Sequence, residues 1–450
     1  MSHKNDICEK RKSKRERKIN PKDIQLPKGY SIEVFASGLT APVSLITAAN
    51  GDMYLADSGA GDKNGKVYKY SGKHFELIAD GFHAPLTGIS FYNGDIYVSH
   101  RGVISILKPN GKVINILTGL PSYGDHYNNQ VTFGNDGKMY FGQGTATNSG
   151  VVGEDNSHWV KKYPFFHDYP GNSICVNGLN YKTRNLFTPS IFEEAFTGAF
   201  SPFGTPISNT EQIKGVIKAT GSILRANPDG SDLELVAWGL KNPFRLKFDK
   251  QNKLFAANHG MNARGSRPIE NSPDEFQLIY QNVWYGWPDY SGGMPITNAI
   301  FKPKNYPQPQ FLLAQHLMSP PKPFAAFPSH SGIMGFDFSP DENFGNAGDI
   351  FIAEFGNIGC KGKRAVPSPN VGHRVSKIDN NTGAVSVFAA NKSGFPASYT
   401  NDGGFETPID VMFTNKGSMF IVDFGVISED KDYETGTGVI WRIKKHNKSC

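Results

Sequence analysis

The sequence predicts an all-β fold, a six-bladed β-propeller with two long loop insertions and a disordered basic N-terminal tail. One pattern occurs six times: two apolar strands joined by a tight turn, ending in a polar residue followed by Gly. A third strand follows most copies, and a fourth often follows that. The 49 Gly and 29 Pro, with only 20% charged residues, are typical of short strands joined by turns. Four antiparallel strands repeated six times indicate a propeller.

The clearest copy of the repeat lies within Gly124–Gly144. Its strands, Gln130–Phe133 and Lys138–Phe141, flank the turn Asn135-Asp136-Gly137. Asp-Gly between two apolar runs is a strong hairpin signal, because Gly accepts the positive φ that such turns need. The other five copies are Pro42–Gly59, Pro85–Gly102, Asn242–Gly260, His330–Gly356 and Pro408–Gly425.

The ends of the repeat predict how the ring closes. Third strands are expected at 66–70, 103–108, 221–227, 373–379 and 438–444. Tyr30–Leu39 has the pattern of a fourth strand with no blade before it, whereas the last blade has no fourth strand after residue 444. Pairing of these two segments would complete the last blade and remove an open sheet edge.

The predicted organisation is a basic disordered tail over residues 1–28 and a single propeller domain over 29–447. Two insertions, about 150–217 in the third blade and about 261–325 in the fourth, are rich in Pro, Gly, Asn and aromatic residues. Loops of this length are usually functional or disordered. Their aromatic content favours ordered loops that pack over one face.

The basic character of the chain belongs to its N-terminus. Residues 1–22 hold nine basic and three acidic residues, so the rest of the chain carries 38 of each. No nucleic-acid partner is expected, because such a run is usually a solvated extension. No apolar run reaches the length of a membrane span, and the start lacks an apolar signal region. As written, the sequence predicts a cytoplasmic protein.

Residues at the starts of the innermost strands are expected to converge at the axis. His126, preceded by Asp125, is the first candidate for a general base; the alternative is turn chemistry alone. His330 has the same placement in another blade. His259-Gly260-Met261 resembles a loop that exposes carbonyls to a hard cation such as Ca²⁺, or is a simple Gly turn. Further polar residues expected near the axis are His83, Asn129, Lys241, Asn242, Ser329, Glu406 and Thr407.

Several motifs carry a resemblance to a known family. RGSRPIENSPDE, within 258–279, is followed by YGWP, within 285–293, and this combination is quite specific. Further matching segments are 124–150, 166–183, 238–249, 328–338, 348–356 and 406–413. From about Tyr30 to Lys445 the chain resembles the soluble quinoprotein sugar dehydrogenases of the glucose/sorbosone type. The segment FHDYPG and the RGSRP loop look closer to the sorbosone type.

The resemblance implies a six-bladed propeller that holds pyrroloquinoline quinone (PQQ) over its axis with Ca²⁺. The implied reaction is oxidation of a small-molecule sugar, an aldose or sorbosone, with electrons passed to an external acceptor. By match, His126 would take the hydroxyl proton while hydride passes to the quinone, and Asp125 would orient His126. The carbonyls of Gly260 and Met261, beside His259, would ligate Ca²⁺ and polarise the quinone carbonyl.

The resemblance also implies the cofactor contacts. Lys241 and Asn242 match residues that touch cofactor oxygens, and His83 falls near another contact. The family places further basic residues at positions near Gly356, Thr407 and Ile409 of this chain. Because PQQ is a tricarboxylate, other basic or imidazole side chains are expected to supply these contacts. The candidates are Arg264, Arg267, His330 and Arg374, together with Lys361, Lys363 and Arg364.

Two other functions fit the same repeat. One is a Ca²⁺-dependent hydrolase of the six-bladed lactonase kind, with Asp57, Glu354 and Asp423 as metal ligands. The other is a non-catalytic propeller that binds a carbohydrate or a partner through its aromatic loops. Fold alone does not choose among these functions. The family resemblance also leaves export from the cell open.

Overall fold

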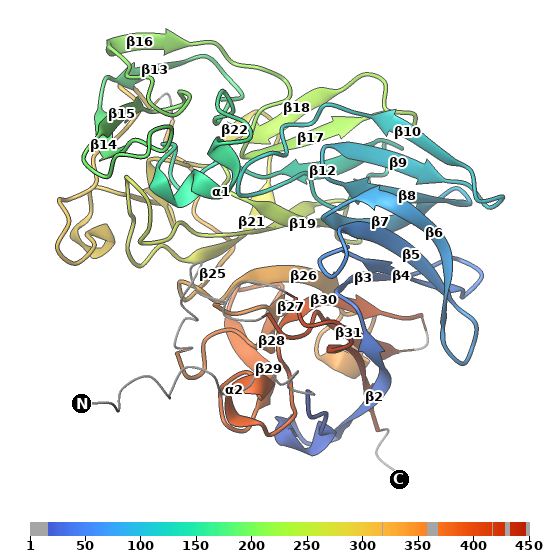
Figure 1. Ribbon diagram of the computed structural model, residues 1–450. Helices are drawn as coiled ribbons and strands as arrows, with labels where there is room; N and C mark the ends of the chain where they lie inside the picture. Colours follow the sequence, from blue (N-terminus) through green and yellow to red (C-terminus); the bar gives the residue numbers. More distant parts are fainter. Residues whose placement is uncertain (1–16, 317, 358–367, 416, 428–432, 447–450) are drawn as a thin grey trace, which may run out of the picture.

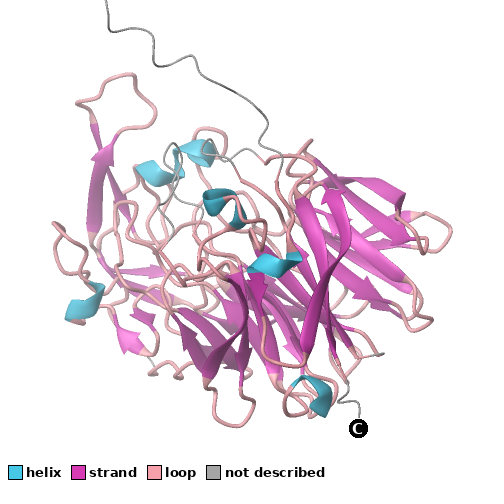
Figure 2. Ribbon diagram, turned by 90° about the horizontal axis from the view of Figure 1, so that it is seen from below, coloured by secondary structure: helices cyan, strands magenta, loops and turns pink. Residues whose placement is uncertain are grey.

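The computed structural model describes residues 17–316, 318–357, 368–415, 417–427 and 433–446. The strands form six antiparallel sheets arranged as the blades of a propeller (Figure 1). Strands make up most of the ordered elements, and the helices are short (Figure 2). No helix in the described part of the chain is long and apolar enough to cross a membrane.

Each blade consists of four strands, which are named below in order from the innermost outwards. Blade 1 contains β3 (Pro42–Thr47), β4 (Met53–Asp57), β5 (Asn64–Tyr70) and β6 (Phe75–His83). Blade 2 contains β7 (Leu86–Tyr92), β8 (Asp95–His100), β9 (Val103–Leu107) and β10 (Val113–Leu117). Blade 3 contains β11 (Thr132–Phe133), β12 (Met139–Gln143), β17 (Ser222–Ala226) and β18 (Glu234–Trp238).

The second half of the ring repeats this order. Blade 4 contains β19 (Pro243–Phe248), β20 (Leu254–Asn258), β21 (Asp274–Ile279) and β25 (Ala325–Phe327). Blade 5 contains β26 (Ile333–Phe338), β27 (Ile350–Glu354), β28 (Arg374–Ile378) and β29 (Val385–Asn391). Blade 6 contains β30 (Pro408–Phe413), β31 (Ser418–Asp423), β32 (Gly438–Lys445) and β2 (Tyr30–Leu39).

The predicted ring closure is confirmed. β2 pairs with β32 in antiparallel register from Tyr30 opposite Lys445 to Leu39 opposite Gly438. The first long strand of the chain therefore completes the last blade. This pairing covers an edge that blade 6 would otherwise expose to solvent.

The start of the described chain corrects one prediction. Residues 1–28 were expected to be disordered, but residues 17–28 are packed against the ring. Arg17 forms a buried ion pair with Asp423 at 2.5 Å, and β1 (Ile24–Gln25) pairs with the outer strand of blade 5. The charge pattern concealed these contacts because most of the basic residues precede them. Residues 1–16 lie outside the described residues.

The two insertions differ from the prediction in one respect. The first lies between β12 and β17 and forms two hairpins beside the ring (Figure 1). The second is interrupted, because β21 is the third strand of blade 4 and falls inside the predicted range 261–325. Smaller elements here are η2 (Glu154–Asn156), α1 (Ser157–Val160), β13 (Ile174–Asn177), β14 (Asn180–Arg184), β15 (Glu194–Gly198), β16 (Asn209–Ile213), β22 (Val283–Trp284), β23 (Tyr290–Ser291), β24 (Met294–Pro295) and η3 (Ala299–Phe301).

Other short elements lie outside the insertions. They are η1 (Pro21–Asp23), η4 (Glu342–Phe344) and α2 (Ala397–Thr400). One insertion element extends a blade: β22 adds a parallel strand to the outer edge of blade 3, with Val283 opposite Ala237. A segment between the third and fourth strands of blade 4 therefore covers the edge of the neighbouring blade.

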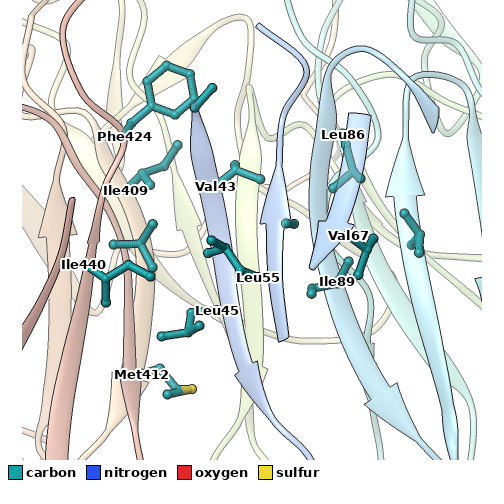
Figure 3. Close-up of a cluster of buried hydrophobic side chains, with 14 of the residues drawn as sticks. Val43, Leu45, Leu55, Val67, Leu86, Ile89, Ile409, Met412, Phe424 and Ile440 are labelled. Carbon is teal, nitrogen blue, oxygen red and sulfur yellow. The ribbon is translucent and has the colours of Figure 1, made fainter. Parts of the chain in front are cut away.

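The apolar core is divided among the spaces between blades. One cluster joins blades 6, 1 and 2 and includes Val43, Leu55, Leu86 and Ile440, all at most 3% exposed (Figure 3). Comparable clusters lie between the other neighbouring blades. Alternating apolar residues on both faces of each sheet make this packing possible, and their burial holds the blades face to face.

The axis itself is polar. In each blade, one residue near the start of the innermost strand faces the axis. In five of the six blades the pairing of that strand with the second strand is irregular at this residue. Such bulges redirect a side chain. The six residues are Ser44, Gly88, Gln130, Arg245, Gly335 and Asp410.

A buried charge pair lies at the centre of this layer. Arg245, 0% exposed, lies 3.3 Å from Asp410. A Cβ on Gly88 would overlap Gln130 Oε1, and a Cβ on Gly335 would overlap Asp410 Oδ1. The two glycines therefore leave room for the larger polar side chains of the neighbouring blades.

The second strands end in buried polar residues, and four of the six accept hydrogen bonds from backbone amides. They are Asp57, His100, Gln143, Asn258, Glu354 and Asp423. Asp423 accepts from the amides of Glu406 and Thr407, each at 2.9 Å. Asp423 and Asn258 thereby satisfy buried donors at the starts of the inner strands of blades 6 and 4, which would otherwise be costly to bury. The polar residues that close each repeat are thus structural.

We expect Asp410→Ala to lower the free energy of unfolding by about 3–5 kcal/mol, because it leaves the Arg245 charge buried without its partner. The double variant Arg245→Met/Asp410→Ala removes both charges and is expected to lose markedly less. Urea unfolding followed by tryptophan fluorescence measures both. The pairing would be contradicted if the double variant lost as much unfolding free energy as Asp410→Ala and Arg245→Met lose together when measured singly.

Asp57 generates a pH-dependent prediction. Burial raises the pKa of its carboxyl from 3.8 to about 6, against the hydrogen bond from the Gly59 amide. The folded state therefore binds the proton more tightly than the unfolded state. Its stabilising contribution is complete below pH ~4 and is lost as the pH rises through about 6, a change of roughly 3 kcal/mol.

The matched variant is Asp57→Asn, which keeps an acceptor for the Gly59 amide and cannot ionise. We expect the variant to match the native protein at pH 4 and to exceed its unfolding free energy by roughly 3 kcal/mol at pH 7.5. Urea unfolding at both pH values tests this. The same difference at the two pH values would show that Asp57 does not titrate between them.

Candidate active site

His126 lies at the start of the inner segment of blade 3, with one ring nitrogen fixed by the backbone. Its Nδ1 donates to the Thr145 carbonyl at 3.0 Å and lies 3.2 Å from Thr145 Oγ1. A carbonyl only accepts, so Nδ1 carries the proton and Nε2 keeps its lone pair. This is the tautomer that a general base requires.

The surroundings keep His126 neutral. Burial is the main cause that holds its pKa well below 6.5, and the charge of Lys241 adds to the effect. The negative charge of Asp125 acts in the opposite direction. An imidazole in this state accepts a proton at neutral pH, and Asp125 stabilises the resulting cation.

Asp125 does not orient His126 in the predicted way. Its carboxylate accepts from Trp159 Nε1 at 3.0 Å and Asn156 Nδ2 at 3.1 Å. It also pairs with Arg264 at 2.5 Å. The orienting contact of His126 belongs to Thr145, and the influence of Asp125 is exerted through its charge.

Arg264 connects the insertion loops to this cluster. Its guanidinium pairs with both Asp125 and Asp155. Burial raises the pKa of Asp155 to about 6. For Asp125, burial is the largest single cause and raises the pKa, but the charges of Arg264 and His126 and the hydrogen bonds from Arg264 and Trp159 together keep it below 3.8. Arg264 was predicted as a cofactor contact; it lies beside Asp125, and two carboxylates already neutralise its charge.

Lys241 and Asn242, at the start of the inner strand of blade 4, lie close to His126. A Cβ on Gly144 would overlap both His126 Cβ and Asn242 Oδ1, which shows how closely the two residues approach. Lys241 Nζ donates to the Gly260 carbonyl at 2.6 Å. Burial, reinforced by Arg264, lowers the pKa of Lys241 to about 7.

His259 completes the ring of polar residues, with its centroid 6.4 Å from that of His126. Its Nδ1 accepts from Asn242 Nδ2 at 3.1 Å, and its Nε2 donates to the Ile333 carbonyl at 2.9 Å. Both ring nitrogens are therefore occupied. Burial lowers its pKa, so the ring is neutral and serves as a fixed spacer.

The predicted calcium ligands do not fit a divalent cation. The Gly260 carbonyl accepts from the Lys241 ammonium, and His259 has no free nitrogen. Among the described residues, no group of three His, Cys, Asp or Glu side chains forms a metal site. The calcium assignment for His259, Gly260 and Met261 is therefore not supported by the geometry.

Two of the predicted cofactor residues are structural instead. Arg267 is 2% exposed and contacts Asp289 and the carbonyls of Ser149, Pro288 and Gln310. Arg374 pairs with Glu354 at 2.9 Å. Both guanidiniums therefore bind acceptors within the fold: Arg267 binds acceptors of the insertions, and Arg374 binds the carboxylate of Glu354.

The remaining predicted residues within the described part of the chain make no contact with His126. His83 is exposed at the end of β6, with its ring centroid 5.3 Å from that of His100. His330 lies in a turn with φ of 70°. Lys361, Lys363 and Arg364 fall outside the described residues.

The hydrolase alternative loses its proposed ligands. Asp57 accepts from Gly59, Glu354 pairs with Arg374, and Asp423 pairs with Arg17. Each carboxylate serves its own blade. In the described chain they do not form a common metal site.

Sequence reasoning missed several residues of the cluster. Thr145 lies two residues after the second strand of blade 3, directly after the Gly that ends the repeat. This position in the repeat is the signal that could have identified it. Asp155 and Trp159 come from the first insertion, which has no repeat to align. Arg101 follows the second strand of blade 2, with its guanidinium 5.4 Å from the ring centroid of Tyr127.

Comparison with known proteins gives a sequence match over part of the chain. No protein-family model matches the chain. Over 183 residues the chain is 24% identical to quinoprotein glucose dehydrogenase B of Acinetobacter calcoaceticus. The match covers 40% of this chain and 30% of that protein.

Solved structures match over almost the whole length. The PQQ domain of a pyranose dehydrogenase from Coprinopsis cinerea, in its holo form, aligns with a TM-score of 0.56 at 12% identity, covering 94% of this chain and 97% of that one. The PQQ-bound aldose sugar dehydrogenase of Streptomyces coelicolor aligns with a TM-score of 0.52 at 14% identity, covering 93% and 100%. The chain therefore shares the six-bladed propeller of the soluble quinoprotein sugar dehydrogenases and, over one segment, resembles them in sequence.

Proposed function

We propose that the chain is a PQQ-dependent oxidoreductase that oxidises a sugar or sugar aldehyde, of the aldose or sorbosone type, and passes electrons to an external acceptor. The observation that carries the proposal is the fixed tautomer of His126. Its Nδ1–H is held by the Thr145 carbonyl, so Nε2 is a ready proton acceptor. The similarity to quinoprotein sugar dehydrogenases supports the same reaction class.

His126 performs the proton transfer in this proposal. Nε2 accepts the hydroxyl proton of the substrate as the carbon–hydrogen bond is oxidised. The new imidazolium charge is stabilised by Asp125, whose own ionised state is maintained by Arg264. Thr145 holds the ring in place throughout, so no reorientation is needed between proton uptake and release.

The charge balance of the site suits an anionic cofactor. Lys241 is 3% exposed, and among the described residues no carboxylate lies within 4 Å of its ammonium. Lys241 and Asn242 would contact PQQ oxygens, and Arg101, over Tyr127, is a further cation for a carboxylate. When bound, PQQ supplies the electrophilic quinone carbonyl that takes the hydride.

The first test is a titration of purified apoprotein with PQQ, followed by dye reduction with a panel of aldoses and sugar aldehydes. We expect saturable PQQ binding and sugar-dependent dye reduction. His126→Ala should keep PQQ affinity and lose the rate of dye reduction by about 10²–10⁴-fold, because the base is removed while the cofactor contacts remain.

The matched control is His74→Ala, which alters an exposed histidine in the β5–β6 turn, where the side chain is 70% exposed. It should retain both affinity and rate. If micromolar PQQ does not bind the native protein, the quinoprotein assignment is wrong. Saturable sugar binding without any dye reduction would instead support the non-catalytic carbohydrate-binding propeller.

A further inference from the structure

The Lys241 ammonium occupies the oxygen that the family resemblance assigns to a metal ion. Lys241 Nζ lies 2.6 Å from the Gly260 carbonyl, and the side chain is buried. Its charge acts on His126, and the charges of Asp274 and Asp125 act on it in turn. The cation is therefore an integral part of the cluster around the proposed base.

The Gly260 carbonyl is held rigidly in this direction. The Gly260 amide donates to Asp274 Oδ1 at 2.6 Å, and the Gly332 amide donates to the other oxygen of Asp274 at 2.6 Å. A Cβ on Gly260 would overlap the Pro273 carbonyl. The neighbouring Met261 amide donates to Ser272 Oγ at 2.7 Å. The loop has little freedom to turn its carbonyl away from Lys241.

A divalent cation at this oxygen would face strong repulsion. Ca²⁺ binds oxygens at about 2.3–2.6 Å and takes six to eight of them. On the Gly260 carbonyl it would lie within a few ångströms of the ammonium. The small cavity lined by Lys241, Gly260 and Glu275 has a volume of about 10 Å³, the space of a single water.

We propose that the Lys241 ammonium replaces the divalent cation of this site, so that an anionic quinone with one oxygen against this ammonium binds without a metal ion. The inference rests on the proposed function and specifies how this chain meets its need for positive charge. The ammonium of Lys241 has three donors. It can therefore keep its hydrogen bond to the Gly260 carbonyl and also donate to an oxygen of PQQ.

The experiment measures PQQ affinity of the full chain by quenching of tryptophan fluorescence, at pH 6, where the Lys241 amine is protonated. Protein treated with EDTA is compared with protein in millimolar Ca²⁺. We expect dissociation constants that agree within twofold. Lys241→Met in EDTA should bind at least tenfold more weakly, and Lys241→Arg should retain metal-independent binding.

The matched control is Lys218→Met, because Lys218 also donates to a carbonyl, that of Thr118 at 2.7 Å, but on an exposed surface. It should leave PQQ affinity unchanged. Thermal unfolding of each variant establishes that it is folded. A second readout is Tb³⁺ luminescence sensitised by Trp287, which lines the cavity beside Lys241; only Lys241→Met should produce it.

The outcomes separate the two proposals. A tenfold or greater gain in native affinity on adding Ca²⁺ would overturn the inference and leave the quinoprotein function intact. Unchanged affinity in folded Lys241→Met would also overturn it. If PQQ binds neither with nor without Ca²⁺, the proposed function itself fails, and the metal question no longer arises.

Discussion

The buried pair Arg245–Asp410 is the interaction on which the geometry of the ring depends. It joins the inner strands of blades 4 and 6 across the axis, in a layer where two glycines make space for it. Gln130 of the same layer follows His126 by four residues, and Arg245 follows Lys241 by four. The base and the lysine thus stand at equal sequence distances from the axial layer, in which Arg245 pairs with Asp410 and Gln130 accepts from Ser44.

The site combines two sources of residues with different physical constraints. His126, Lys241 and Asn242 belong to the repeat, and the side chain of Asn258 accepts from the amides of Lys241 and Asn242 at 3.0 Å. Arg264, Asp155 and Trp159 come from the insertions and surround Asp125. The repeat provides position, because hydrogen bonds to the backbone fix each strand start. The insertions provide charge balance, because Arg264 pairs with both Asp125 and Asp155.

The repeat made the blades predictable, including the closing strand Tyr30–Leu39, because alternation and turn residues are local signals. β21 was missed because it lies between irregular segments and its partner β20 is separated from it by a loop. The orientation of Asp125 was not predictable, because its partner Arg264 is far away in the sequence. The position of Arg17 was hidden for a similar reason: a cation in a basic run shows no sign of the buried carboxylate that it meets.

Closure of the ring by β2 has a consequence for synthesis of the chain. β2 ends at residue 39 and its partner β32 begins at residue 438, so β2 leaves the ribosome long before its partner is made. At about 5–20 residues per second, the interval is on the order of a minute. Throughout this interval β2 has an unpaired backbone edge, while blades 1 to 5 acquire all their strands. The nascent protein therefore depends on protection of one early strand, and any pause late in translation prolongs its exposure to aggregation.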